Sequence, residues 1–142
     1  MKKNYLPAAA ILTTVFLTGC ATSSEIEAKR AEFKRTIPTC SGTKDCNAKW
    51  EAAQLWVVHN AGWKVQNQSS ALIETYDAVN SHRDDRHSDR STAISIRVTK
   101  EPLGQGRYQL LAYVWCDNSF GCTPDEWDAA LAFNRAIGKV SP

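Results

Sequence analysis

The sequence predicts an α+β fold in which an antiparallel sheet of three to four strands carries two helices on one face. Two segments with helical spacing of apolar residues, at about 44–60 and 123–138, enclose a stretch with strand-like alternation. Short turn segments separate the expected strands, which favours hairpin connections and therefore an antiparallel sheet. The expected order is helix, strand, strand, strand, strand, helix, stabilised by two disulfides.

The first expected helix covers about residues 44–60. Thr43 precedes it as a candidate N-cap, and Asp45 lies in the first turn, where a negative charge suits the helix dipole. Gly62 follows as the expected helix stop. His59 lies near the helix end, and we interpret it as a C-terminal charge or a packing residue rather than a catalytic or ligand histidine. The residues of the expected buried face are Cys46, Trp50, Ala53 and Val57.

Four segments with strand character follow this helix. The third is the clearest, because Ile94, Ile96 and Val98 alternate with polar residues and so mark a core face. The fourth carries apolar residues on both faces, which favours a central position in the sheet or a cover on its second side. The four segments are 63–68, 71–76, 92–99 and 107–116, and the polar residues expected to face solvent in the third are Ser95, Arg97 and Thr99.

Between the second and third strands, residues 80–91 form a polar run of mixed charge. The run contains His82, His87 and three aspartates, which raises the alternative of a metal site. Three interleaved arginines oppose a bound cation, and no ligand spacing fixes a geometry. We therefore expect a solvated loop here and no metal site.

The clearest local signature outside the N-terminal segment precedes the last helix. Thr123-Pro124-Asp125-Glu126 has the form of a capping box. In this interpretation Thr123 is the N-cap, Pro124 is the first helical residue, and Glu126 reaches back to the N-cap. The expected apolar face consists of Trp127, Ala130, Leu131, Phe133 and Ile137, and Gly138 ends the helix.

The first twenty residues have the organisation of an export signal. Lys2 and Lys3 are followed by an apolar run from residue 6 to residue 17 and then by Leu17-Thr18-Gly19-Cys20. This ending resembles the lipobox of bacterial lipoprotein precursors, and the resemblance covers residues 1–20 only. The resemblance implies cleavage before Cys20 and a lipid, such as palmitate, on that cysteine. The alternative is an ordinary signal peptide in which Cys20 is incidental.

The same resemblance implies an address and a division of the chain. Ala21 follows the cysteine where an aspartate would favour retention at the inner membrane, so the implied location is the outer membrane, with the domain facing the periplasm. The expected parts are a signal peptide at 1–19, a lipid-anchored tether at 20–38 and a single α+β periplasmic domain at 39–142.

The tether is heavily charged. Its Glu25 and Lys29 have helical spacing, but Ile26 and Phe33 form only a thin apolar stripe. An amphipathic helix lying on a membrane would need a broader apolar face. We therefore favour a solvated spacer, with a short helix as the alternative, which ends before Pro38.

The charge balance argues against a nucleic-acid partner. The formal net charge of +2 comes from 17 basic and 15 acidic residues. Removal of residues 1–19 takes away Lys2 and Lys3, so 17 − 2 leaves 15 basic residues against 15 acidic ones. A neutral chain without a basic stripe lacks the electrostatic attraction that binding to phosphates requires.

Four cysteines remain once Cys20 is set aside for lipid. An even number in an oxidising compartment predicts two disulfides, for which three pairings are possible. We favour the two short-range pairs, each of which encloses five residues and sits where an expected helix starts. The alternative zinc site usually brings its cysteines as pairs with two to four intervening residues, which these lack. The favoured pairs are Cys40–Cys46 and Cys116–Cys122.

No catalytic signature is recognisable in the sequence. It lacks the Gly-x-Ser-x-Gly elbow, the His-Glu-x-x-His pair, glycine-rich phosphate loops and Cys-x-x-Cys, so we expect no enzyme activity and no cofactor. The segment 115–122 is the candidate contact surface, because a disulfide-closed loop that carries Trp115, Asn118 and Phe120 would be rigid. The alternative, which we favour, is that these residues pack in the core or form the turn.

Two function classes therefore follow from the sequence. The first is a non-catalytic, lipid-anchored envelope lipoprotein whose periplasm-facing domain binds an unidentified envelope protein or has a structural role. The alternative is a small periplasmic inhibitor or ligand-binding domain for a glycan, a lipid or a hydrolase. The general plan resembles that of small proteobacterial envelope lipoproteins without an assigned activity.

Overall fold

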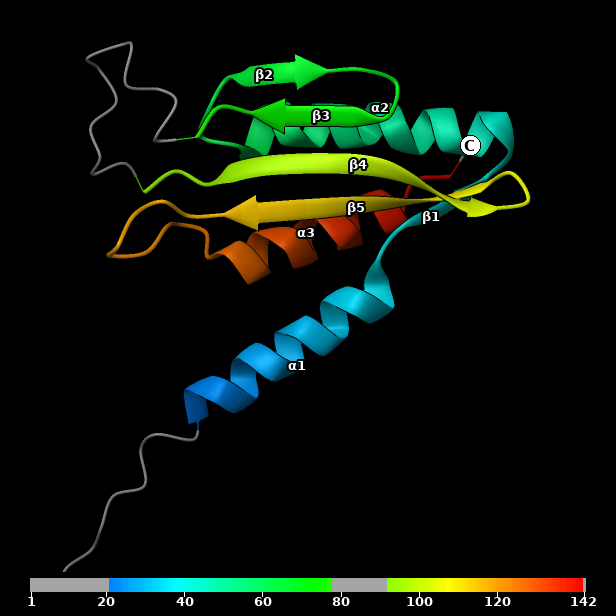
Figure 1. Cartoon of the computed structure of the whole chain (residues 1–142). Coiled ribbons are helices and arrows are strands. Elements are labelled where there is room, and N and C mark those ends of the chain that lie inside the picture. Colours follow the sequence, from blue (N-terminus) through cyan, green and yellow to red (C-terminus); the bar gives the residue numbers. More distant parts are fainter. Residues whose placement is uncertain (1–20, 78–91, 142) are drawn as a thin grey trace, which may run out of the picture.

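The computed structural model describes residues 21–77 and 92–141. They form an α+β fold in which a five-stranded antiparallel sheet is packed against helices (Figure 1). The strands lie in the order β1-β5-β4-β3-β2. The elements are α1 (Ala21–Thr36), β1 (Thr39–Ser41), α2 (Gly42–Asn60), β2 (Val65–Gln68), β3 (Leu72–Thr75), β4 (Ser95–Gly104), β5 (Arg107–Trp115) and α3 (Glu126–Gly138).

The predicted fold class is confirmed, with one strand more than expected. β1 was missed because three residues are too short to show an alternating pattern. β1 pairs with β5 at the sheet edge, where Cys40 lies opposite Tyr108. The longest pairing joins β4 and β5 through the turn at Gly104-Gln105-Gly106, and it places Ile96 opposite Val114.

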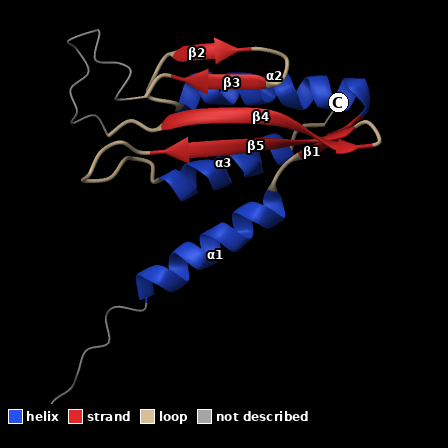
Figure 2. Ribbon diagram, viewed as in Figure 1, coloured by secondary structure: helices blue, strands red, loops and turns tan. Residues whose placement is uncertain are grey.

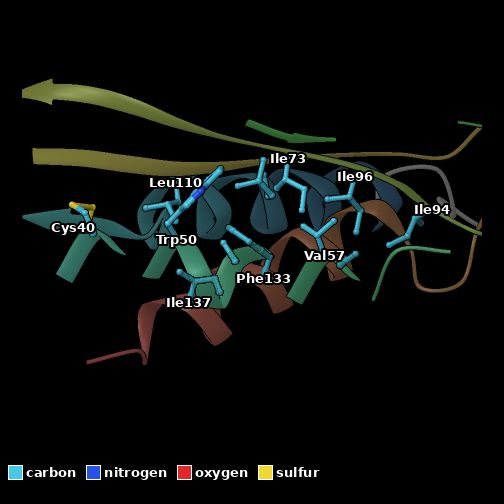
Figure 3. Packing of buried hydrophobic residues seen from close by; sticks show 14 residues of the cluster. Cys40, Trp50, Val57, Ile73, Ile94, Ile96, Leu110, Phe133 and Ile137 are labelled. Carbon is cyan, nitrogen blue, oxygen red and sulfur yellow. A yellow bond between two sulfur atoms is a disulfide. The ribbon is translucent and has the colours of Figure 1, made fainter. Parts of the chain in front are cut away.

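The core lies between the sheet and the two helices α2 and α3, which cover the same face of the sheet (Figure 2). Trp56 of α2 meets Phe133 of α3 edge to face, with ring centroids 5.3 Å apart. Figure 3 shows how side chains from the sheet and from both helices interleave in this layer. The fully buried residues include Val57, Ile73, Ile96, Val98, Leu110, Phe133 and Ile137.

The alternation predicted for residues 92–99 holds on its core side and fails at one polar position. Ile94, Ile96 and Val98 are buried, and Arg97 is exposed as expected. Ser95 is only 1% exposed, although we expected it to face solvent. It lies opposite Trp115 on β5, and a large neighbour of this kind shields a small side chain from water.

Both disulfides predicted from the cysteine spacing are present. The Cα atoms are 5.0 Å apart in Cys40–Cys46 and 5.8 Å apart in Cys116–Cys122. The first bond joins the edge strand β1 to the first turn of α2, and the second joins the end of β5 to the segment that leads into α3. Each bond therefore fixes a junction between a strand and a helix.

The start of α2 differs from the prediction. Ser41 is the N-cap, so the helix begins before Thr43, and the side chain of Ser41 makes no capping hydrogen bond. Instead, the carboxylate of Asp45 accepts a 2.9 Å hydrogen bond from the backbone N–H of Ser41. This bond, followed by a hydrogen bond from Lys49, lowers the pKa of Asp45 below its ordinary value.

The predicted capping box before α3 is wrong. The N-cap is Asp125, whose Oδ1 accepts hydrogen bonds of 3.0 Å from the backbone N–H groups of Trp127 and Asp128. Glu126 does not reach back to the cap, because its Oε1 accepts a 3.1 Å hydrogen bond from the backbone N–H of Cys116. The disulfide junction brings the end of β5 close to this carboxylate. The spacing of residues in the sequence does not predict the hydrogen bond that results.

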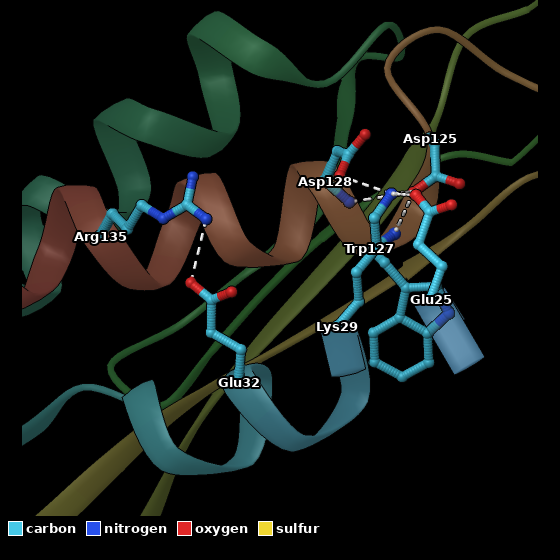
Figure 4. Close-up of polar contacts among 7 residues, drawn as sticks. All are labelled: Glu25, Lys29, Glu32, Asp125, Trp127, Asp128 and Arg135. Carbon is cyan, nitrogen blue, oxygen red and sulfur yellow. Dashed lines mark hydrogen bonds and ion pairs between the residues drawn. The ribbon is translucent and has the colours of Figure 1, made fainter. Parts of the chain in front are cut away.

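Residues 21–36 do not form the solvated spacer that the charge pattern favoured. They form helix α1, which lies against α3 (Figure 1). Phe33 meets Trp127 edge to face, with ring centroids 5.9 Å apart. Ion pairs flank this contact, with Lys29 2.8 Å from Asp128 and Glu32 3.0 Å from Arg135 (Figure 4).

A second apolar stripe on α3 explains why this thin helix packs. Trp127, Leu131 and Asn134 follow one another at intervals of four and three residues, so they share one helix face. Ala130 and Leu131 are buried although neither belongs to the core cluster between sheet and helices. The apolar stripe of α1 is thin, but it packs against the second stripe of α3, which would contact water if α1 were absent.

Candidate functional site

The loop closed by the Cys116–Cys122 disulfide is the first part of the candidate site. Asn118 folds it internally, since its Oδ1 accepts a 2.8 Å hydrogen bond from the N–H of Phe120 and its carbonyl accepts one of 2.9 Å from Gly121. Gly121 has φ = +92°, a backbone conformation that glycine adopts readily and other residues rarely adopt. The loop is therefore held in one turn by covalent and backbone constraints together.

Phe120 lies on this turn with its side chain in solvent. It is 99% exposed, against 47% for Tyr113 on the neighbouring strand. A large apolar side chain gains free energy when it leaves water, so a fully exposed phenylalanine on a rigid turn is available for a contact outside the chain.

A shallow pocket of about 270 Å³ lies beside the loop. Its walls come from the loop itself and from the start of α3. Both carboxylates in the wall are engaged, Asp125 by the first N–H groups of α3 and Glu126 by Cys116. The lining residues are Cys116, Asn118, Ser119, Gly121, Cys122, Asp125 and Glu126.

The second part of the candidate site lies on the outer face of the sheet, opposite α2 and α3. Glu74, Arg97 and Tyr113 are aligned across β3, β4 and β5 by the strand register. The guanidinium of Arg97 lies over the ring of Trp115, 5.8 Å from its centroid. We call Glu74, Arg97, Tyr113 and Trp115 the outer-face cluster.

Glu74 holds the charge of this cluster in place. Its carboxylate accepts a 3.0 Å hydrogen bond from the Asn67 side chain and one of 2.6 Å from Nε of Arg97. These two interactions, with that of Asn67 first, lower the pKa of Glu74 below its ordinary value. Glu74 thus stays ionised and orients the Arg97 guanidinium, which in turn covers Trp115.

The three predicted contact residues lie within one short segment of the sequence but do not form one surface of like side chains. Trp115 is half-buried in the outer-face cluster, and Asn118 is half-buried and shapes the loop. Phe120 alone is fully exposed. Tyr113 was missed as a contact residue because apolar residues on both faces of β5 did not reveal which face the helices cover.

The structure offers no metal-binding cluster within residues 21–77 and 92–141, where no group of three or more His, Cys, Asp or Glu side chains could hold an ion. His59 is exposed at the end of α2. Cys20, His82 and His87 lie outside the described residues, so the predicted lipidation site and polar loop are not part of this geometry.

The helices of the described ranges do not include one with both the length and the apolar character needed to cross a membrane.

Comparisons of the chain with protein-family models, with curated proteins and with solved structures found no match.

Proposed function

We propose that the protein is a non-catalytic envelope lipoprotein, anchored to the outer membrane through a lipid on Cys20, whose periplasm-facing domain binds a protein partner through the outer-face cluster. The proposal joins two separate lines of support. The N-terminal sequence supports the anchor, and the exposed residues of the sheet support the partner surface.

The observation that carries the partner surface is the composition of the outer-face cluster. Tryptophan, tyrosine and arginine are the residue types most enriched where protein interfaces derive their binding energy. Tyr113 is 47% exposed, and the Arg97 side chain is 48% exposed. Helices α2 and α3 occupy the other face of the sheet, so neither of them covers this face from an external protein (Figure 2).

The position of α1 supports the anchor. The helix begins at Ala21, directly after Cys20, and it is fastened to α3 by Phe33, Lys29 and Glu32. A lipid on Cys20 would therefore hold the domain by a packed helix rather than by a flexible spacer. Such a connection gives the domain a preferred orientation on the membrane, which suits a fixed partner surface.

A second candidate function is a small periplasmic inhibitor or ligand-binding domain. The observation that favours it is the Cys116–Cys122 loop, which presents Phe120 beside the pocket. The volume of about 270 Å³ lies just below the range of roughly 300–1,000 Å³ typical of small-molecule sites. Because the pocket is smaller than a typical ligand site, the outer face of the sheet is better supported as the binding surface than the pocket is.

Site-specific photocrosslinking in intact cells tests the proposal. The photoreactive residue p-benzoylphenylalanine replaces Tyr113 in one strain and Leu55 in a matched control strain. Leu55 is 61% exposed but lies on α2, away from the outer face. We expect a protein adduct at position 113, none at position 55, and loss of the adduct when Cys20→Ala removes the anchor.

Two results would contradict the proposal separately. Equal labelling at positions 113 and 55, or none at either, would refute the outer face as the partner surface. An adduct that persists at full yield in the Cys20→Ala strain would show that the partner does not depend on the lipid.

A further inference from the structure

We propose that the Cys116–Cys122 loop is a second membrane contact, in which Phe120 inserts into the lipid surface that holds the N-terminal anchor. The inference rests on the proposed lipid at Cys20 and adds a site to it. In this inference the exposed Phe120 side chain contacts lipid and not a protein partner.

The first argument is that the loop and the start of α1 lie at the same end of the molecule. α1 and α3 run in the same direction, because Lys29 pairs with Asp125 and Asp128 at the start of α3, whereas Glu32 pairs with Arg135 farther along (Figure 4). The loop immediately precedes α3. Figure 1 accordingly shows the connection between β5 and α3 at the end where α1 begins.

The second argument is one of reach. Lys29 lies eight residues after Ala21, so α1 extends about 12 Å past its contact with the start of α3. The polar headgroup layer on each side of a bilayer is about 5–8 Å thick. A lipid on Cys20 would therefore hold the start of α3, and the loop that projects from it, within a short distance of the membrane surface.

The third argument is the chemistry of the loop. Phe120 is 99% exposed and lies between Ser119 and Gly121, two small residues that do not hinder its approach to lipid. The hydrogen bonds of Asn118 hold the turn before any contact is made, so insertion costs little conformational entropy. Aromatic side chains are the ones that proteins place at the membrane interface.

Two carboxylates near the loop are engaged by groups of the protein, although the Asp125 side chain is still 51% exposed and Asp117, in the loop itself, is exposed. Asp125 accepts two backbone hydrogen bonds and lies 3.6 Å from the Lys29 ammonium, and Glu126 accepts one from Cys116. The hydrogen bond with Asp128 is the main cause that raises the pKa of Lys29, so this ammonium stays charged beside them. Repulsion between these acidic groups and lipid phosphates is thereby reduced.

A membrane explains Phe120 better than a protein partner does. An aromatic anchor in a protein interface is normally surrounded by further contact residues that keep water out. Tyr113, the nearest exposed large hydrophobic residue along the described chain, belongs to the outer face of β5. Ile26, at 43% exposure, lies in the part of α1 that extends past α3, so it adds apolar area at the membrane end.

The test is photocrosslinking of the full-length protein in intact cells with p-benzoylphenylalanine at position 120. The substitution keeps an aromatic side chain at a residue that is 99% exposed, so folding is preserved. The same group at position 113 is the matched control. The crosslinked loop peptide is analysed by mass spectrometry, and the lipid on Cys20 is measured in the same sample from its N-terminal peptide.

We expect a phospholipid adduct on the peptide that contains position 120, at a yield several-fold above that at position 113. A protein adduct at position 120 would overturn the inference and favour the inhibitor-like function of the loop. The absence of any adduct on a protein whose Cys20 carries lipid would also overturn it. An unmodified Cys20 would refute the proposed anchor itself, so the two failures are distinguishable.

Discussion

The side-chain amide of Asn134 in α3 donates a 3.1 Å hydrogen bond to the backbone carbonyl of Phe33 in α1, across a sequence separation of 101 residues. The last four carbonyls of a helix have no N–H partner within the helix, and α1 ends at Thr36. Asn134 therefore caps the C-terminus of α1 from a neighbouring helix. A second bond from the same amide group to Thr36 Oγ1, also 3.1 Å, strengthens this cap.

The first prediction concerns this cap. Asn134→Ala removes both hydrogen bonds and leaves the Phe33 carbonyl only the longer 3.3 Å bond from Thr36 Oγ1, which should cost about 1–3 kcal/mol for the two bonds together. We expect the amides of α1 to exchange with deuterium faster than those of α2. The control is Arg135→Ala, which removes only the exposed ion pair with Glu32 and should cost less than about 1 kcal/mol. Equal protection of α1 in wild type and Asn134→Ala would disprove the capping role.

The second prediction compares two phenylalanines of opposite burial. Phe133 is fully buried, so Phe133→Ala should lower the free energy of unfolding by about 3–5 kcal/mol. Phe120 is 99% exposed, so Phe120→Ala should change it by no more than about 0.5 kcal/mol. Urea denaturation measures both values. A large effect of Phe120→Ala would mean that the loop residue packs within the fold and could not serve as a membrane contact.

The third prediction concerns the two disulfides, which close loops of the same length. Replacement of either pair by serines should cost about 2 kcal/mol in the chain-entropy model. The structural consequences should differ. Loss of Cys116–Cys122 should increase hydrogen exchange at residues 117–121, while loss of Cys40–Cys46 should affect β1 and the first turn of α2. Non-reducing peptide mapping verifies the wild-type pairing, and a Cys46–Cys116 link would contradict it.

The fourth prediction concerns pH. The pKa of Glu74 is lowered by the hydrogen bond from Asn67 and then by Arg97, so the ionised form is favoured in the folded state. Its stabilisation is fully present above the ordinary value of 4.5 and is lost as the pH falls through the lowered pKa. Glu74→Gln should therefore be less stable than wild type at neutral pH, by up to about 1 kcal/mol for a partly exposed pair. The difference should shrink as the pH falls from 4.5 through the lowered pKa, as measured by thermal unfolding, and a constant difference would refute the assignment.

The fifth prediction concerns Gly62. A Cβ added at this position would overlap the Cβ of Ala93. Gly62→Ala should therefore destabilise the fold by about 1–3 kcal/mol through overpacking. The second-site change Ala93→Gly should recover part of the loss, and a double-mutant cycle measures the coupling. Additive effects of the two substitutions would show that the close approach is not the reason for glycine here.

Gly62 also shows that the role of a glycine can differ from the role that its position in the sequence predicts. Its position after the first helix predicts a helix stop, and the helix does end at Asn60 with Ala61 as its C-cap, but Gly62 lacks the positive φ of a glycine stop. The requirement for glycine comes instead from the close approach of Ala93, 31 residues later. The local sequence around residue 62 includes the glycine, but it does not include Ala93, the neighbour that leaves no space for a side chain.

The sequence by itself determined the features that depend on local periodicity and on cysteine spacing. A helix at about 44–60 was predicted because Trp50 and Val57 recur at helical intervals, and the strand around Ile96 because apolar and polar residues alternate. The four cysteines likewise predicted both disulfides. In each of these cases, the residues that form the pattern lie within a short stretch of consecutive sequence.

The tertiary structure alone decided which weak or ambiguous elements pack. The thin stripe of α1 becomes a helix contact because α3 has a second stripe, and Glu126 leaves its predicted capping role because the disulfide brings Cys116 within reach. The two apolar faces of β5 are distinguished only when the helices cover one of them, which leaves Tyr113 on the other. These outcomes depend on contacts between residues distant in sequence, and the free energy of such contacts has no local signature.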